Sequence, residues 1–150
     1  MRLRNFFAPD TVDLALSGTT RDQVLPELVA LLKLGATDSE TLVRTLQRRE
    51  SIGSTGVGRG LAVPHSRSPL VSGLRLAYGR QLAGVDYQAL DGKPVYHFFL
   101  IVAPPDERTN QYLPVLGRIA QLGKDPEIGE RLAALKSVDE FFALLEAKGV

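Results

Sequence analysis

Apolar residues recur at helical spacing near both ends of the chain and at strand spacing between them. In the first third, leucines and valines three and four positions apart predict two helices, one from about residue 20 to 35 and one from 37 to about 49. Each begins with capping-box spacing, in which two side chains bond each other's backbone N–H groups: Thr20 with Gln23, and Thr37 with Glu40. Pro26 lies inside the first segment and predicts a kink or a later start.

The middle third has the pattern of β-strands. A glycine-rich stretch, 51–60, leads into a short apolar run at 61–63 that Pro64 stops. Residues 74–78 alternate between apolar and more polar side chains, and residues 95–102 are apolar on both alternating faces. The second pattern is typical of a strand that is covered on both sides.

The last third returns to helical spacing, with one apolar face over residues 113–120. Asp125-Pro126 predicts an N-cap followed by proline at the first helical position, and residues 137–140 have a third capping box. Helices before and after a set of strands predict an α/β fold, a three-layer sandwich with a mixed β-sheet flanked by helices. We expect a single domain over residues 1–150.

Composition narrows the classes of function. The chain has 150 residues, of which 44% are apolar and 23% charged, with a formal net charge of +1 and no cysteine. Disulfides, thiolate zinc sites and cysteine nucleophiles are therefore excluded, and no basic field favours nucleic acid or an anionic membrane. The longest apolar run, 98–105, is too short to span a membrane, and the N-terminus lacks a signal-peptide core, so we expect a cytoplasmic protein.

The segment from residue 49 to 65 carries the candidate chemistry. Four glycines within eight residues allow positive φ angles, which can turn successive N–H groups towards one anion. Hydroxyl donors, guanidinium groups and a nucleophilic imidazole accompany them: Ser54, Thr55, Arg49, Arg59 and His65. The P-loop and Rossmann motifs do not fit. Spacing alone leaves two interpretations open, a phosphoryl group held on His65 and a flexible glycine loop with a chance histidine.

The segment GSTGVGRGLAVPH, together with Arg49-Glu50 before it, resembles the phosphorylation-site signature of the fructose/mannitol-type (type 2) enzyme IIA domains of the bacterial phosphotransferase system. It is most similar to the stand-alone nitrogen-regulatory branch of that family. The resemblance covers almost the whole chain, including the Lys93-Pro94 entry to the long predicted strand and the Pro104 exit.

The resemblance implies a regulatory phosphotransferase without a cofactor or a metal. His65 corresponds to the phosphoacceptor and Arg49 to an arginine that holds the phosphoryl group. The loop lining the site corresponds to Ser54, Thr55, Gly56 and Gly58. The implied donor is an HPr-like phosphohistidine carrier, and sensor kinases or potassium transporters are candidate targets.

Three positions depart from the family pattern. Tyr112 stands where the family usually has a second active-site histidine, Arg59 replaces a loop asparagine, and Ser66 replaces a glycine. A phenol cannot become a cation at neutral pH, so we expect Arg59 to supply the missing charge and Tyr112 to donate a hydrogen bond to the phosphoryl group. Two alternatives stay open: a binding module that turns over no phosphoryl group, and a sugar-specific IIA component that passes phosphoryl to a separate IIB.

The remaining polar candidates have simpler interpretations. His97, within an apolar run, is predicted to pack in the core, and two histidines alone make an incomplete metal site. Glu50 either orients the neighbouring Arg49 or is a solvated charge at a helix end, and we favour the second interpretation. Arg67 and Arg80 could face an acidic partner, but we expect solvated charges. Asn110 is a weaker candidate than Tyr112 for contact with the phosphoryl group.

Overall fold

The computed structural model describes residues 1–150 and contains one mixed β-sheet. Its six strands are β1 (Val12–Asp13), β2 (Gly56–Gly58), β3 (Leu61–Ala62), β4 (His65–Arg67), β5 (Arg75–Val85) and β6 (Val95–Ala103). The helices are α1 (Arg21–Ala30), α2 (Ala36–Ile52), α3 (Tyr112–Gly123), α4 (Ile128–Ala133) and α5 (Val138–Ala147), preceded by two 3₁₀ turns, η1 (Leu3–Phe6) and η2 (Pro9–Thr11).

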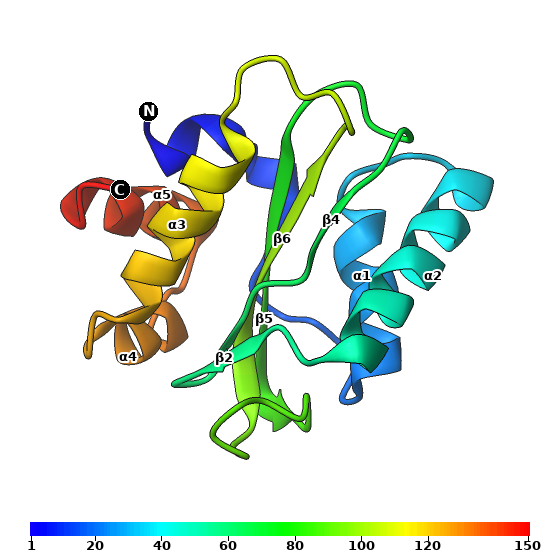
Figure 1. Cartoon of the computed structure of the whole chain (residues 1–150). Helices are drawn as coiled ribbons and strands as arrows, with labels where there is room; N and C mark the ends of the chain where they lie inside the picture. The colour runs from blue at the N-terminus through cyan, green and yellow to red at the C-terminus, as the bar shows by residue number, and fades with distance from the viewer.

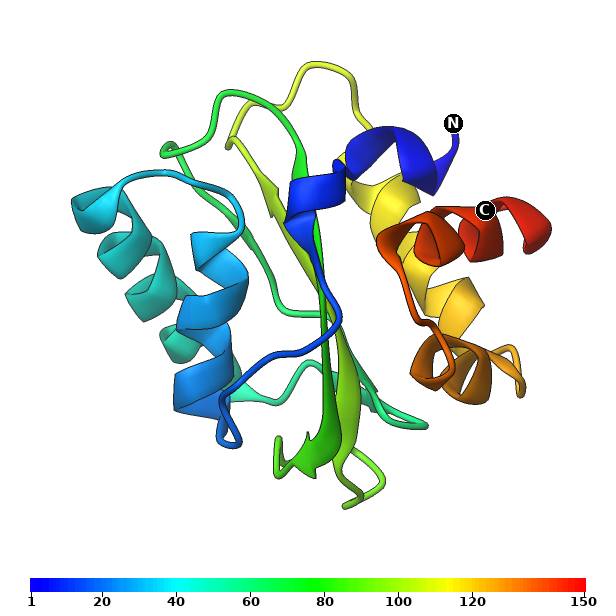
Figure 2. The same ribbon diagram turned by 180° about the vertical axis from the view of Figure 1, so that it is seen from behind.

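The helices lie in two layers on opposite faces of the sheet. Helices α1 and α2 cover one face, and α3, α4 and α5 cover the other together with the N-terminal turn (Figures 1 and 2). The predicted three-layer α/β sandwich is confirmed, and both chain ends lie in the same helical layer (Figure 1).

Strand β6 is the centre of the sheet. It pairs antiparallel with β5 and parallel with β3 and β4, while β5 pairs parallel with β1 and β2 forms an antiparallel hairpin with β3. The strand order is β1-β5-β6-β3-β2, with β4 beside the second half of β6. The two parallel neighbours of β6 bring the segment that ends at His65 against the most buried strand of the protein.

The two faces of the sheet bury two separate hydrophobic clusters. On β6, Phe99 and Ile101 pack towards α3 and α5, while Phe98 and Leu100 pack towards α1 and α2. All four side chains are fully buried. This confirms the prediction of a strand covered on both sides and leaves its edges, where loops enter and leave, as the places for exposed chemistry.

Three helix starts test the capping predictions. Thr20 caps α1 by accepting a hydrogen bond from the Gln23 N–H, and Pro26 lies inside that helix. The cap predicted at Thr37 is wrong: α2 begins one residue earlier, at Ala36, after Gly35 with φ of +89°. Helix α4 begins at Ile128, later than predicted, because Asp125-Pro126 forms the turn that precedes it.

Candidate functional site

His65 is the first residue of β4 and lies beside the second half of β6, where it pairs with Ile101. Its ring is half-buried, and the Nδ1 atom lies 2.7 Å from the carbonyl oxygen of Val63. A carbonyl oxygen can only accept, so Nδ1 carries the proton of the neutral ring. The lone pair is therefore on Nε2, which forms no hydrogen bond within the chain.

Tyr112 and Arg67 flank the imidazole. Tyr112 opens α3, and its ring centroid lies 6.5 Å from that of His65. Arg67 is two residues beyond His65, hence on the same face of β4, and its guanidinium carbon lies 4.6 Å from the Tyr112 ring centroid. Burial raises the pKa of Tyr112, against the opposing charges of Arg67 and Arg49, so its hydroxyl stays protonated as a hydrogen-bond donor.

Arg49 lies in the last turn of α2, and this helix packs against β4. Its Nη1 atom donates to the Gly53 carbonyl oxygen at 2.7 Å, which leaves most of its N–H donors free. The charges of Arg49 and Arg67 both act on Tyr112. The structure thus places the Arg67 guanidinium against the Tyr112 ring beside His65, and the charge of Arg49, at the end of α2, also acts on Tyr112.

The glycine-rich stretch leads from the end of α2 into a β-hairpin, and three of its amides do not face an open anion site. The N–H groups of Thr55, Gly56 and Arg59 donate to the Glu50 carboxylate, the Ser54 hydroxyl and the Asp91 carboxylate, respectively. These amides are already paired within the chain, so they are not available to an anion in this conformation.

Ser54 and Thr55 use their hydroxyl groups in hydrogen bonds within the protein. The Ser54 hydroxyl donates to the Tyr87 carbonyl oxygen at 2.7 Å, and the buried Thr55 hydroxyl donates to the Glu50 carboxylate. Glu50 is only 3% exposed, so the expectation that it is a solvated charge is wrong. It anchors the end of α2, and with it Arg49, to the segment that leads to His65.

The glycines serve the packing of the hairpin. A Cβ atom on Gly56 would lie 2.7 Å from the Cβ of Ala89, and Gly58 has φ of +97°, which disfavours other residues. Both positions therefore need glycine for a reason that does not involve a ligand.

Arg59 is not brought to His65. Arg59 forms the turn between β2 and β3. The next residue, Gly60, accepts the N–H of His97 on β6, whereas His65 pairs with Ile101, four residues further along that strand. The Arg59 guanidinium donates to the Lys124 carbonyl oxygen at the end of α3. The cation beside Tyr112 is instead Arg67, contrary to the expectation of a solvated charge. Its spacing from His65 along a strand was the signal that could have found it.

The other candidates take up structural positions. His97 is 2% exposed, its Nδ1 lies 2.8 Å from the Tyr78 hydroxyl, and burial lowers its pKa to about 4, which confirms a core histidine. Arg80 is buried, contrary to expectation, and donates to carbonyl oxygens that include those of Leu14 and Leu132. Asn110 lines a small cavity beside Tyr112.

None of the helices has both the length and the apolar character needed to cross a membrane. Nor do any three His, Cys, Asp or Glu side chains come together in a way that could hold a metal ion.

Comparison with known proteins places the chain in a family. Residues 5–148 match the family model described as "Phosphoenolpyruvate-dependent sugar phosphotransferase system, EIIA 2". The chain is 30% identical over 146 residues to the nitrogen regulatory protein of Bradyrhizobium diazoefficiens, covering 97% of this chain and 95% of that protein. It is 31% identical over 147 residues to the fructose-specific EIIABC component of Bacillus subtilis, covering 97% of this chain but only 23% of that protein.

Solved structures agree with this assignment. The crystal structure of the nitrogen regulatory protein IIA-Ntr from Neisseria meningitidis matches with a TM-score of 0.85 and 28% identity over 95% of this chain and 98% of that one. The mannitol IIA of Escherichia coli shares the fold, with a TM-score of 0.77 and 22% identity over 93% of this chain and 98% of that one. The chain therefore belongs to the EIIA type 2 family of the phosphoenolpyruvate-dependent sugar phosphotransferase system.

Proposed function

We propose that this protein is a nitrogen-regulatory IIA protein whose His65 is reversibly phosphorylated by an HPr-like phosphohistidine carrier. The observation that carries the proposal is the state of the His65 ring, whose Nδ1 is held by the Val63 carbonyl while Nε2 keeps a free lone pair. The nitrogen-regulatory relatives support the branch, because the chain is 30% identical to the Bradyrhizobium protein and matches IIA-Ntr with a TM-score of 0.85, against 0.77 for the mannitol IIA.

In the proposed transfer, the Nε2 lone pair of His65 attacks the phosphorus of the carrier's phosphohistidine in line with the bond that breaks. A new N–P bond forms on Nε2, the N–P bond of the carrier breaks, and its electron pair returns to the carrier's imidazole nitrogen. The proton stays on Nδ1 and remains hydrogen-bonded to the Val63 carbonyl oxygen, and this bond holds the ring in one orientation throughout.

Side chains stabilise the negative charge on the transferring phosphoryl group. Arg49 and Arg67 supply cationic donors and Tyr112 a neutral hydroxyl, from three different elements around His65. Ser54, Thr55, Gly56 and Gly58 act indirectly, by fixing the hairpin and the end of α2 that carries Arg49. Any contact of their own with the phosphoryl group requires the loop to release the bonds seen here.

The test is phosphorylation by phosphoenolpyruvate, enzyme I and the cognate carrier, followed by intact mass. We expect an acid-labile gain of one phosphoryl group that is lost in His65→Ala and kept in His97→Gln, and NMR should place the phosphorus on Nε2. No gain under conditions that phosphorylate a standard family member would leave the binding-module alternative. Phosphorus on Nδ1 would contradict the ring geometry.

Two further experiments separate the remaining alternatives. Because Tyr112 supplies no cation, Tyr112→His should raise the phosphorylation rate, whereas an unchanged rate would show that Arg67 already meets the charge. The 31% identity to a fructose-specific component favours sugar transport as the second candidate function. Rapid transfer from phospho-His65 to a purified fructose IIB would support it over regulation.

A further inference from the structure

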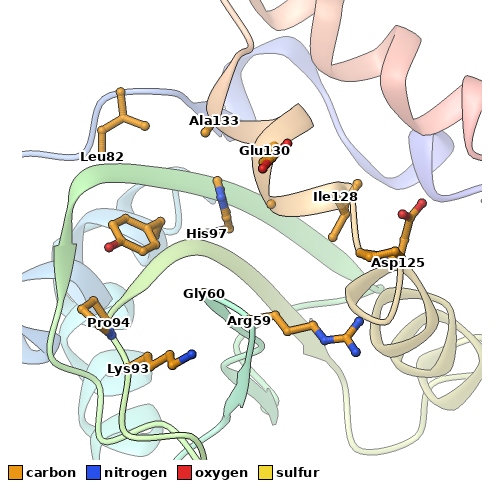
Figure 3. A pocket seen from close by; sticks show the side chains of 13 residues that line it. Arg59, Gly60, Leu82, Lys93, Pro94, His97, Asp125, Ile128, Glu130 and Ala133 are labelled. Atoms are coloured by element: carbon orange, nitrogen blue, oxygen red, sulfur yellow. The ribbon is translucent and has the colours of Figure 1, made fainter.

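A cavity of about 690 Å³ lies at the end of the sheet away from His65. It is bounded by the β2–β3 turn at Arg59-Gly60, the entry to β6, and α4 (Figure 3). This volume is within the range of sites for small organic ligands. Arg59 and Gly60 of its lining belong to the glycine-rich segment, but the proposed phosphotransfer does not use this cavity. The lining combines apolar walls with cations that form no ion pair.

The apolar wall consists of Tyr96, Leu82 and Ile128. The Tyr96 ring is held between two glycines, because a Cβ atom on Gly60 would lie 3.1 Å from it and one on Gly84 2.9 Å. Leu82, on the neighbouring strand β5, lines the same cavity although 57% of the residue is exposed. Ile128 closes the opposite side from the start of α4 (Figure 3). An exposed leucine beside a fixed aromatic ring offers a flat apolar surface that solvent covers poorly.

Two cations without acidic partners stand at the opening. Neither Arg59 nor Lys93 forms an ion pair. The Arg59 guanidinium donates one hydrogen bond, to the Lys124 carbonyl oxygen, and its other N–H groups stay free. The φ of Arg59, +57°, is uncommon for a residue with a long side chain, and such backbone strain is retained where the surrounding structure fixes it.

Three carboxylates lie near these cations and differ in their partners. Asp125 is paired with Lys148 at 2.6 Å, and Asp91 accepts the backbone N–H groups of Arg59 and Lys93. Glu130 is exposed on α4, across the opening from Lys93 (Figure 3).

The floor adds positive potential. His97 lines it as a neutral ring, since burial lowers its pKa to about 4. The buried Arg80 also acts on that ring and makes its bonds to backbone carbonyls, with no carboxylate partner.

We propose that this cavity binds a small organic anion with a flat apolar body. The negative group lies between Arg59 and Lys93, and the body lies against Tyr96, Leu82 and Ile128. An anion is favoured on the Arg59–Lys93 side of the cavity, because neither cation forms an ion pair and Arg80 adds positive charge beneath the floor. The unpaired carboxylate of the lining, Glu130, lies on α4 at the opposite side of the opening (Figure 3). The proposal does not depend on phosphorylation of His65.

The test is an NMR titration of the full ¹⁵N-labelled chain with phenylacetate as the probe. We expect saturable shifts centred on the amides of Gly60, His97 and Gly129, also in His65→Ala. The uncharged, similarly shaped phenylacetamide should bind about tenfold more weakly, because it lacks the charge-assisted hydrogen bonds.

Matched variants locate the site. Arg59→Gln and Lys93→Gln should each weaken phenylacetate binding about fivefold to tenfold, whereas Arg48→Gln and Lys136→Gln, which remove the same charges elsewhere on the surface, should not. Ala133→Trp, on the exposed rim, should block the cavity. Absence of saturable shifts, equal affinity for the amide, or insensitivity to these variants would each overturn the proposal.

Discussion

Glu50 is a carboxylate that the fold buries without a cationic partner. Its two oxygens accept the Thr55 N–H at 3.0 and 3.1 Å, and the Thr55 hydroxyl donates to them as well. A buried charge is retained when hydrogen bonds replace its water shell, and here those bonds close the corner between α2 and the hairpin. The corner fixes where Arg49 leaves its helix.

Glu50→Gln should therefore lower the free energy of unfolding by about 1–3 kcal/mol, because an amide NH₂ would replace one of the two acceptors that face Thr55. Urea unfolding followed by circular dichroism measures this. Glu40→Gln, at an exposed position of the same helix, is the control and should change little. Equal stability of the two variants would show that the Glu50 charge is unimportant to the fold.

His97 makes stability depend on pH in a defined window. Its folded-state pKa of about 4 lies below the ordinary value of 6.5 because the ring is buried. Above pH 6.5 the ring is neutral in both states and contributes no pH dependence. As the pH falls from 6.5 to 4, the unfolded chain gains a proton that the folded chain does not, so stability declines by about 3 kcal/mol.

His97→Gln should remove this decline, since an amide does not titrate but still offers a hydrogen-bonding group near Tyr78. Denaturant unfolding at several pH values between 7 and 4 measures the difference in slope between the two proteins. The other histidine, His65, is present in both and cancels. Parallel slopes would contradict the assignment of the window to His97.

At the scale of elements, two of the three helix starts where serine or threonine was predicted to cap provide a matched comparison. Ser137 accepts the Glu140 N–H at 3.2 Å at the start of α5. Thr37 lies inside the first turn of α2, and its hydroxyl caps nothing. Ser137→Ala should cost about 1 kcal/mol of stability and Thr37→Ala almost nothing. Thermal unfolding of both variants tests this, and an equal cost would contradict the assigned helix starts.

The same comparison shows which elements the sequence could predict. Helical periodicity and the caps at Thr20 and Ser137 depend on residues within one turn of each other, and those predictions were confirmed. The start of α2 was misplaced because Gly35, with its positive φ, brings the chain into the helix before Thr37. The local sequence pattern does not distinguish a helix that starts after Gly35 from one that is capped by Thr37.

The glycine-rich stretch was misinterpreted for a different reason. Gly56 packs against Ala89, and the Arg59 N–H donates to Asp91, both more than thirty residues further along the chain. No local pattern indicates such partners. That His65 and Arg67 share one face follows from the alternation of side chains along β4. The position of the Arg59 side chain instead depends on the end of α3, where it binds the Lys124 carbonyl oxygen.

At the scale of the whole molecule, the sheet connects two cores that share no side chains. Alternate residues of β5 and β6 enter opposite clusters, so each strand is covered by both helical layers. Tyr78 is fully buried in the cluster under α5, and Tyr87 is fully buried in the cluster under α1 and α2. These two of the four tyrosines report separately on the two layers.

Leu28→Ala removes a fully buried side chain from the cluster under α1 and should lower the free energy of unfolding by about 2–5 kcal/mol. Because β5 and β6 cannot keep one face packed after the other is lost, we expect both layers to unfold in one transition. With fluorotyrosine labelling, the ¹⁹F signals of Tyr78 and Tyr87 should shift to the same lower denaturant midpoint. If Tyr78 kept the midpoint of the unaltered protein, the two layers would be independent folding units, and a change in one layer could not be transmitted through the sheet to His65.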